Sequence, residues 1–165
     1  MNKPLDKKPM SVALGVIGGS GAYDLLTNGG LGEKVNTVTL KTPFGESAPI
    51  HHFRAGNLHY LFLSRHGETD YSITAPFVNY RANIYALKEC GVERIISWSG
   101  PGIINTSFKP GDYVLPSDII DETRNRETTF FKNSGIGFIR QGEPFCPQIK
   151  QVVHDSMHAL GFPHH

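Results

Sequence analysis

The sequence predicts an α/β fold in which a mixed central sheet is flanked by helices. Short apolar segments alternate with turn residues along the 165 residues, which include 18 glycines and 11 prolines. Residues 79–90 have a helical apolar period, end at Gly91 and are followed at once by the apolar segment 92–98. A helix, a glycine and a strand in this order form the second half of a crossover unit. Because several strand patterns precede the crossover without intervening helices, the sheet is expected to be mixed.

Five segments have the length and the apolar pattern of strands. They are residues 12–17, 33–40, 50–54, 58–64 and 92–98. Ala55-Gly56-Asn57 joins the third and fourth segments and is typical of a hairpin, and Thr42-Pro43-Phe44-Gly45 predicts an earlier turn. The segment 92–98 is expected to be a buried strand. We expect further short strands at residues 113–115 and 119–120.

Two helices are predicted from apolar spacing. In residues 79–90, Tyr80, Ile84 and Leu87 share one face. Residues 148–160 form an amphipathic pattern whose apolar members are Ile149, Val152, Val153, Met157 and Leu160. The polar, lysine-rich residues 1–11 are expected to be a flexible tail, and residues 12–165 are expected to belong to one domain.

Composition excludes several classes of function. Sixteen Lys and Arg residues against 15 Asp and Glu leave no basic surplus for nucleic acid or an anionic membrane. No apolar run is long enough to cross a bilayer, so no membrane partner is expected. Cys90 and Cys146 lie far apart without metal-binding or redox spacing, which indicates unpaired thiols in a cytoplasmic protein.

Three predicted strands end in residues that favour an anion. The first runs into the glycines of residues 18–21, where backbone N–H groups can approach an anion and Ser20 adds a hydroxyl. The fourth runs into Arg65 and His66, a guanidinium beside an imidazole. The fifth opens into Ser99 and Gly100. Each feature alone is more typical of a plain turn or a surface pair, but ligands of open α/β sheets bind where strands end. Together they predict one shared anion site.

A second constellation invites a metal-site interpretation. His154 and His158 are four residues apart in the predicted helix 148–160, with Asp155 between them, which resembles half of a zinc hydrolase motif. The glutamate general base of that motif is absent, and both histidines fall outside the apolar set. The pattern therefore favours solvated histidines over metal-dependent hydrolysis, and no metal site is predicted.

Several short motifs follow one another from Leu14 onward: residues 17–23, 42–45, 65–67, 78–84, 86–89, 110–112, 129–131 and 144–147. Together, and in this order, they resemble the methylthioadenosine phosphorylase branch of the purine nucleoside phosphorylase family. The resemblance covers nearly the whole chain and implies a nucleoside phosphorylase-like fold.

The resemblance implies phosphorolysis of a purine nucleoside, 5′-methylthioadenosine or a related one, to a free purine base and a pentose 1-phosphate. It implies phosphate contacts from Ser20, Arg65, His66, Ser99 and the backbone of Gly100. Inorganic phosphate is then a co-substrate and no cofactor is needed. The resemblance also implies a cytoplasmic homotrimer.

Members of the family continue for roughly another hundred residues, within the range of a single domain. The acidic residues that protonate the purine lie in that part, so catalytic residues cannot be assigned here. The chain is therefore expected to be the N-terminal part of the domain, truncated at its C-terminus, and to supply mainly the phosphate half-site. The alternatives are a non-catalytic phosphate-binding fragment and a fragment that associates with a complementary C-terminal chain.

Three positions depart from the family pattern. Trp98 stands where a small residue is common, and two common histidines are replaced, one near Asp70-Tyr71 and one at Phe138. The Phe138 difference bears on how the 5′ side of a nucleoside would be recognised.

Overall fold

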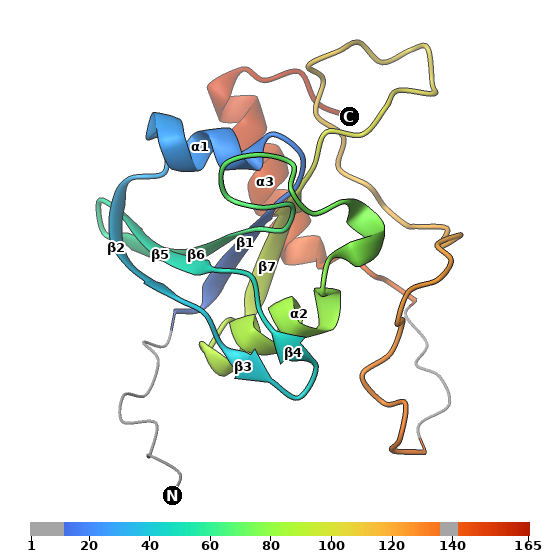
Figure 1. Cartoon of the computed structure of the whole chain (residues 1–165). Helices are drawn as coiled ribbons and strands as arrows, with labels where there is room; N and C mark the ends of the chain where they lie inside the picture. The colour runs from blue at the N-terminus through green and yellow to red at the C-terminus, as the bar shows by residue number, and fades with distance from the viewer. Residues whose placement is uncertain (1–11, 136–141) are drawn as a thin grey trace, which may run out of the picture. The chain divides into compact units, whose positions relative to one another are not determined.

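The computed structural model describes residues 12–135 and 142–165, and Figure 1 shows the chain. The described residues form two compact units that divide after Gly100. The tail predicted at residues 1–11 and the position of Phe138 lie outside the described residues. The assignment of residues 12–165 to one domain stays a prediction.

The first unit is built on a five-stranded sheet with the order β2-β5-β6-β1-β7. Its strands are β1 (Leu14–Gly18), β2 (Glu33–Val38), β5 (Ile50–Ala55), β6 (Leu58–Ser64) and β7 (Arg94–Trp98). β5 is antiparallel to β2 and β6, whereas β1 is parallel to both β6 and β7. The predicted mixed sheet and the predicted hairpin of β5 and β6 are confirmed.

The turn predicted near Pro43 is also present. It joins two short antiparallel strands, β3 (Lys41–Thr42) and β4 (Gly45–Glu46). The Thr42 hydroxyl donates to the carbonyl of Gly45 at 2.7 Å and accepts from the Phe44 N–H at 3.1 Å. The Thr42 side chain thus adds two hydrogen bonds within the turn to the short backbone pairing of β3 with β4.

Helix α2 (Tyr80–Glu89) begins and ends as predicted. The Asn79 side chain caps it by accepting from the Ala82 N–H, and Gly91 follows its end at a φ of 86°. The buried face agrees with the predicted one only in part: Leu87 is buried as predicted, together with Ala82 and Ala86, whereas Ile84 is on the exposed side. Alanines let the helix approach the sheet closely, so small side chains occupy the face on which larger apolar ones were expected.

Two shorter helical segments were not predicted. They are α1 (Ala22–Asn28) and the 3-10 turn η1 (Ala75–Phe77). α1 has only seven residues, and its apolar members, Ala22, Leu25 and Leu26, are too few to stand out in the window of about 11–18 residues over which a helical period is recognised.

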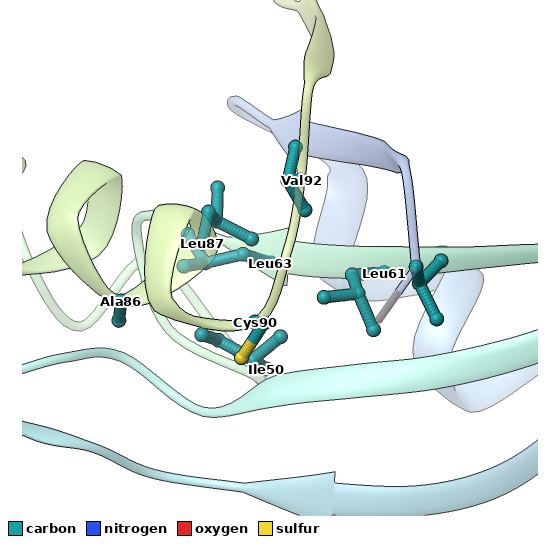
Figure 2. Close-up of a cluster of buried hydrophobic side chains, with 8 residues drawn as sticks. Ile50, Leu61, Leu63, Ala86, Leu87, Cys90 and Val92 are labelled. Carbon is teal, nitrogen blue, oxygen red and sulfur yellow. The ribbon is translucent and has the colours of Figure 1, made fainter. Parts of the chain in front are cut away.

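β6 contributes buried side chains to both faces of the sheet, because successive side chains of a strand point to opposite faces. Leu61 and Leu63 pack with residues of α2, as Figure 2 shows. Tyr60 and Phe62 pack on the other face with Ala22 of α1. The two helices therefore cover opposite faces of the sheet (Figure 1). Burying a side chain such as Leu63 stabilises the fold by about 1.5–3 kcal/mol.

β7 corrects one prediction, because the strand expected to be buried is an exposed edge strand. It is hydrogen-bonded to β1 on one side and is the last strand in the order of the described sheet. Ile95 and Trp98 are 37% and 38% exposed. An apolar pattern shows which side chains a strand can bury, but burial also requires a neighbouring element. The described sheet has no further strand on the side of β7 that faces away from β1.

The second unit contains α3 (Pro147–Leu160), which ends at Gly161 with a φ of 71°. The predicted helix is confirmed, but no residue of it is buried, and Val152 and Leu160 are exposed. Among the described residues, no helix is long and apolar enough to span a membrane.

The short strands predicted after residue 100 are largely absent. Tyr113 forms an isolated parallel bridge with His164, and the prediction of a strand at residues 119–120 is wrong. Ile120 is 90% exposed, because two apolar residues without a pairing segment have nothing to pack against. Cys90 and Cys146 are both free thiols, the first buried and the second exposed.

Candidate functional site

Three strands end at the same level of the sheet. Gly18 at the end of β1 is in register with Ser64 of β6 and with Trp98 of β7, and all three strands are parallel. The residues that follow them therefore leave the sheet together at one side, which we call the carboxyl edge. This is the place where open α/β sheets bind ligands.

Backbone hydrogen bonds connect the three segments at the carboxyl edge. The Gly19 N–H donates to the carbonyl of Trp98 at 2.7 Å, and the Arg65 N–H donates to the carbonyl of Gly18 at 3.1 Å. The first residue after β1 and the first after β6 are thus held by the neighbouring strand end. The positions of Gly19 and Arg65 therefore follow from the register of the sheet.

Gly19 has almost no space around its α-carbon. A β-carbon at this position would lie 2.9 Å from the Ser99 hydroxyl oxygen, 2.9 Å from the Trp98 carbonyl oxygen and 3.0 Å from Arg65 Nη2. Side chains from two other strand ends therefore meet over this glycine. The close approach explains why a residue without a side chain is needed here.

The Arg65 guanidinium makes two hydrogen bonds to side chains. Its Nη2 donates to Ser99 Oγ at 3.2 Å, and its Nε donates to His66 Nε2 at 3.0 Å. Neither acceptor is a carboxylate, so these two bonds leave the positive charge uncompensated. A half-buried guanidinium beside a hydroxyl group at a strand edge is well suited to bind an oxyanion.

His66 is 1% exposed, and both of its ring nitrogens have protein partners. Nδ1 lies 2.7 Å from the carbonyl oxygen of Ile73, and Nε2 receives the bond from Arg65. The ring also stacks on Tyr71, with centroids 4.2 Å apart. The contacts of the imidazole are therefore within the protein, and the predicted contact of His66 with phosphate stays a prediction.

The structure thus brings together three of the five predicted site residues, Arg65, His66 and Ser99. Ser20 and Gly100 are exposed and lie one residue from Gly19 and Ser99 along the chain. Their participation in the same site stays a prediction. Sequence reasoning missed the carbonyl of Ile73, which no motif could reveal because every residue carries a backbone carbonyl.

The loop after β6 is also attached to the sheet. Glu68 pairs with Nε2 of His51, whose Nδ1 lies 2.8 Å from the Thr37 hydroxyl. Burial lowers the pKa of His51 below its usual value, although the Glu68 carboxylate opposes this shift. Burial also lowers the pKa of the neighbouring His52, helped by His59, whose Nδ1 lies 2.9 Å from His52 Nε2.

The metal-site alternative finds no ligand set in residues 12–135 and 142–165. No group of three or more His, Cys, Asp or Glu residues is placed there to hold an ion. His154 and Asp155 are both exposed and contact each other at 3.2 Å. The pair of His154 and His158, four residues apart in the sequence, is therefore not completed by a third ligand in the described chain.

Comparison with known proteins identifies the family. Residues 13–165 match the family model described as the phosphorylase superfamily. The chain belongs to the phosphorylase superfamily.

Its relatives within the superfamily are nucleoside phosphorylases. The chain is 37% identical over 153 residues to S-methyl-5′-thioadenosine phosphorylase of Thermococcus kodakarensis, covering 92% of this chain and 57% of that protein. It is 38% identical over 159 residues to 6-oxopurine nucleoside phosphorylase of Pyrococcus furiosus, with the same two shares covered. This phosphorylase-superfamily chain therefore spans little more than half the length of these curated relatives.

Solved structures confirm the fold of this phosphorylase-superfamily chain. Methylthioadenosine phosphorylase from Schistosoma mansoni in its apo form superimposes with a TM-score of 0.82 at 31% identity. The match covers 92% of this chain and 54% of the other. The mixed sheet flanked by helices and the resemblance proposed from sequence motifs are both supported by this match.

Proposed function

We propose that this chain serves the phosphorolysis of a purine nucleoside, 5′-methylthioadenosine or a related one, and supplies mainly the phosphate half-site. The observation that carries the proposal is the meeting of Arg65 and Ser99 over Gly19 at the carboxyl edge. Ser20 and the backbone of Gly100 complete the proposed set of phosphate contacts, and His66 accepts a hydrogen bond from the Nε–H of Arg65. The names of the relatives supply the reaction class.

The proposed chemistry needs an anion held firmly in one orientation. Phosphate oxygen attacks C1′ of the nucleoside, the bond from C1′ to the purine nitrogen breaks, and its electron pair leaves with the base. By analogy with glycoside cleavage, the sugar passes through an oxocarbenium-like transition state. A phosphate dianion held by Arg65 stabilises the positive charge at C1′ and is at the same time the nucleophile. No protein nucleophile is required, and phosphate is the co-substrate in place of any cofactor.

The proposal assigns the recognition of the base to residues outside 1–165. Both 6-aminopurine and 6-oxopurine enzymes occur among the relatives, and no acidic side chain accompanies Arg65 and Ser99 in the hydrogen bonds described above. We therefore assign the choice between the two purine classes to the part of the relatives that this chain does not span. We include the cytoplasmic location and the homotrimer implied by the family in the same proposal.

A second candidate function is association with a complementary chain without catalysis by the 165 residues themselves. The exposed apolar side chains of edge strand β7, Ile95 and Trp98, support it. The limited coverage of the relatives supports it as well. An added polypeptide could then pair with β7 and supply the base site.

The experiment measures purine release from methylthioadenosine and from inosine, with and without phosphate. The 165-residue chain is tested alone and together with the C-terminal part of the T. kodakarensis relative. The half-site proposal expects phosphate binding by the chain alone, poor turnover alone, and phosphate-dependent turnover in the mixture. Robust turnover by the isolated chain would contradict the assignment of the base site to other residues. Absence of phosphate binding would contradict the proposal as a whole.

Light scattering on the same samples tests the assembly. A homotrimer should have three times the mass of the 18.2 kDa chain. A monomer that gains mass only when the C-terminal polypeptide is added would favour the complementary-chain alternative.

A further inference from the structure

We infer that His66 is a positioning residue, which orients the Arg65 guanidinium by accepting a hydrogen bond at Nε2 while its ring is held in the neutral Nδ1–H form. The inference rests on the proposed phosphate site and gives His66 a role different from direct contact with the anion.

The hydrogen bonds determine the tautomer. The partner of Nδ1 is the carbonyl oxygen of Ile73, which can only accept, so Nδ1 carries the hydrogen. The partner of Nε2 is the Nε–H of Arg65, which can only donate, so Nε2 is the bare nitrogen. A doubly protonated ring would place an N–H against the guanidinium N–H, and the opposite tautomer would lose both bonds.

The surroundings hold the ring in this orientation. The His66 carbonyl accepts from the Ile73 N–H at 2.9 Å and from the Ser72 hydroxyl at 3.2 Å, so the loop closes on itself. Gly67 makes this closure possible with a φ of 121°, a conformation that other residues rarely adopt. Tyr71 stacks on the ring within the same loop.

The hydrogen bond from Nε helps to hold the Arg65 guanidinium in one orientation. Nε donates to His66 and Nη2 donates to Ser99, so one edge of the planar guanidinium is held at two points. An arginine held in this way loses less conformational freedom when it binds an oxyanion, because its fork is already oriented. Removal of the Nε2 acceptor would leave Nε without this partner and allow the guanidinium to rotate.

Two substitutions separate the two ends of the imidazole. In His66→Asn the side-chain amide N–H can replace Nδ1–H toward Ile73, but nothing reaches Arg65. In His66→Gln the amide oxygen can replace Nε2 as acceptor for Arg65. The inference expects the dissociation constant for inorganic phosphate, measured by calorimetry on the full chain, to rise about tenfold in His66→Asn, as for loss of a hydrogen bond to a charged group. In His66→Gln it should stay within about threefold of the original value, since that bond is retained.

Equal phosphate affinity in His66→Asn and the unsubstituted chain would overturn the inference, as would a loss in a folded His66→Gln as large as in His66→Asn. A purely structural role would lower the melting temperature without this difference in affinity. If either variant fails to fold, the ¹⁵N shifts of His66 in the unsubstituted chain decide: a protonated Nδ1 and a bare Nε2 are expected, and the reverse would refute the inference. Arg65→Ala distinguishes the two proposals. If it leaves phosphate binding unchanged, the phosphate site itself is wrong, whereas a loss in Arg65→Ala with none in His66→Asn rejects only the role of His66.

Discussion

Gly19 and Ser99 approach so closely that a β-carbon on Gly19 would lie 2.9 Å from the Ser99 hydroxyl oxygen. The two residues are far apart in sequence and belong to loops after different strands. Their proximity follows from the register of β1 with β7, in which Gly18 faces Trp98. The proposed phosphate site depends on this relationship, and the first prediction addresses it directly.

Substitution of Gly19 by Ala should weaken phosphate binding by about tenfold or more, because the new methyl group displaces Ser99 or the Arg65 guanidinium from a charged hydrogen bond. Calorimetry with inorganic phosphate measures the effect. Gly30→Ala is the matched control, since a β-carbon there meets only a leucine methyl at 4.0 Å. Unchanged affinity in Gly19→Ala would show that the anion does not bind at this edge.

Substitution of Arg65 by Ala should raise the KM for phosphate through the loss of about 2–3 kcal/mol of charged hydrogen bonding. The measurement requires the active assembly with the C-terminal polypeptide, and phosphate affinity of the chain alone provides a second readout. Arg54→Ala serves as control, because this exposed arginine pairs with Glu33 on β2, away from the three strand ends. A similar loss in both variants would indicate a general effect of positive charge.

Stability should decrease as the pH falls below about 6.5, the usual pKa of histidine. In the folded protein burial lowers the pKa of His51 and of His52, so the unfolded chain binds more protons in this range. The loss levels off once the pH is below the folded-state pKa values. Urea unfolding between pH 7.5 and 5 measures it, and His52→Gln should flatten the dependence. A free energy of unfolding that is constant or rises toward pH 5 would contradict this prediction.

A second loss of stability is expected at lower pH from carboxyl groups. Hydrogen bonds from the Lys109 N–H and from His165 lower the pKa of Asp112, and those from Thr123 lower the pKa of Asp121. Their contribution is present above about pH 3.8 and disappears as the pH falls through the lowered values. Asp112→Asn should reduce the change in stability below pH 4 and leave the change between pH 7.5 and 5 intact. An equal effect in both ranges would be evidence against this assignment.

Truncation of Leu63 to Ala should destabilise the first unit by about 2–5 kcal/mol, because removing part of a fully buried side chain leaves a cavity. Leu58→Ala, at the exposed start of the same strand, is the control and should change stability much less. Chemical denaturation measures both. Comparable small losses would mean that the cluster in Figure 2 is not the principal core.

Much of the fold could be predicted because its strands, turns and helix ends are encoded by residues that are close together in the chain. Residues 50–64 contain two strands and a glycine turn in sequence, and Asn79 with Gly91 marks both ends of α2. The same is true of the individual motifs at Ser20, Arg65 and Ser99, each of which lies within two residues of the end of a strand. These features require only near neighbours in the chain.

Which segments and faces are buried depended on the tertiary structure. The burial of β7 and part of the buried face of α2 were predicted wrongly from apolar patterns, because burial depends on which element packs beside a segment. α1 was missed because a helix of seven residues is too short for its apolar spacing to be recognised.

The sequence by itself determined which residue types follow the strands, and hence that an anion site was possible. Only the tertiary structure decided that Gly19, Arg65 and Ser99 meet, since strand register alone brings residues from distant positions to one edge. It also decided that the imidazole of His66 contacts Arg65 and Ile73, because a hydrogen bond depends on distance and direction, which a linear pattern does not contain.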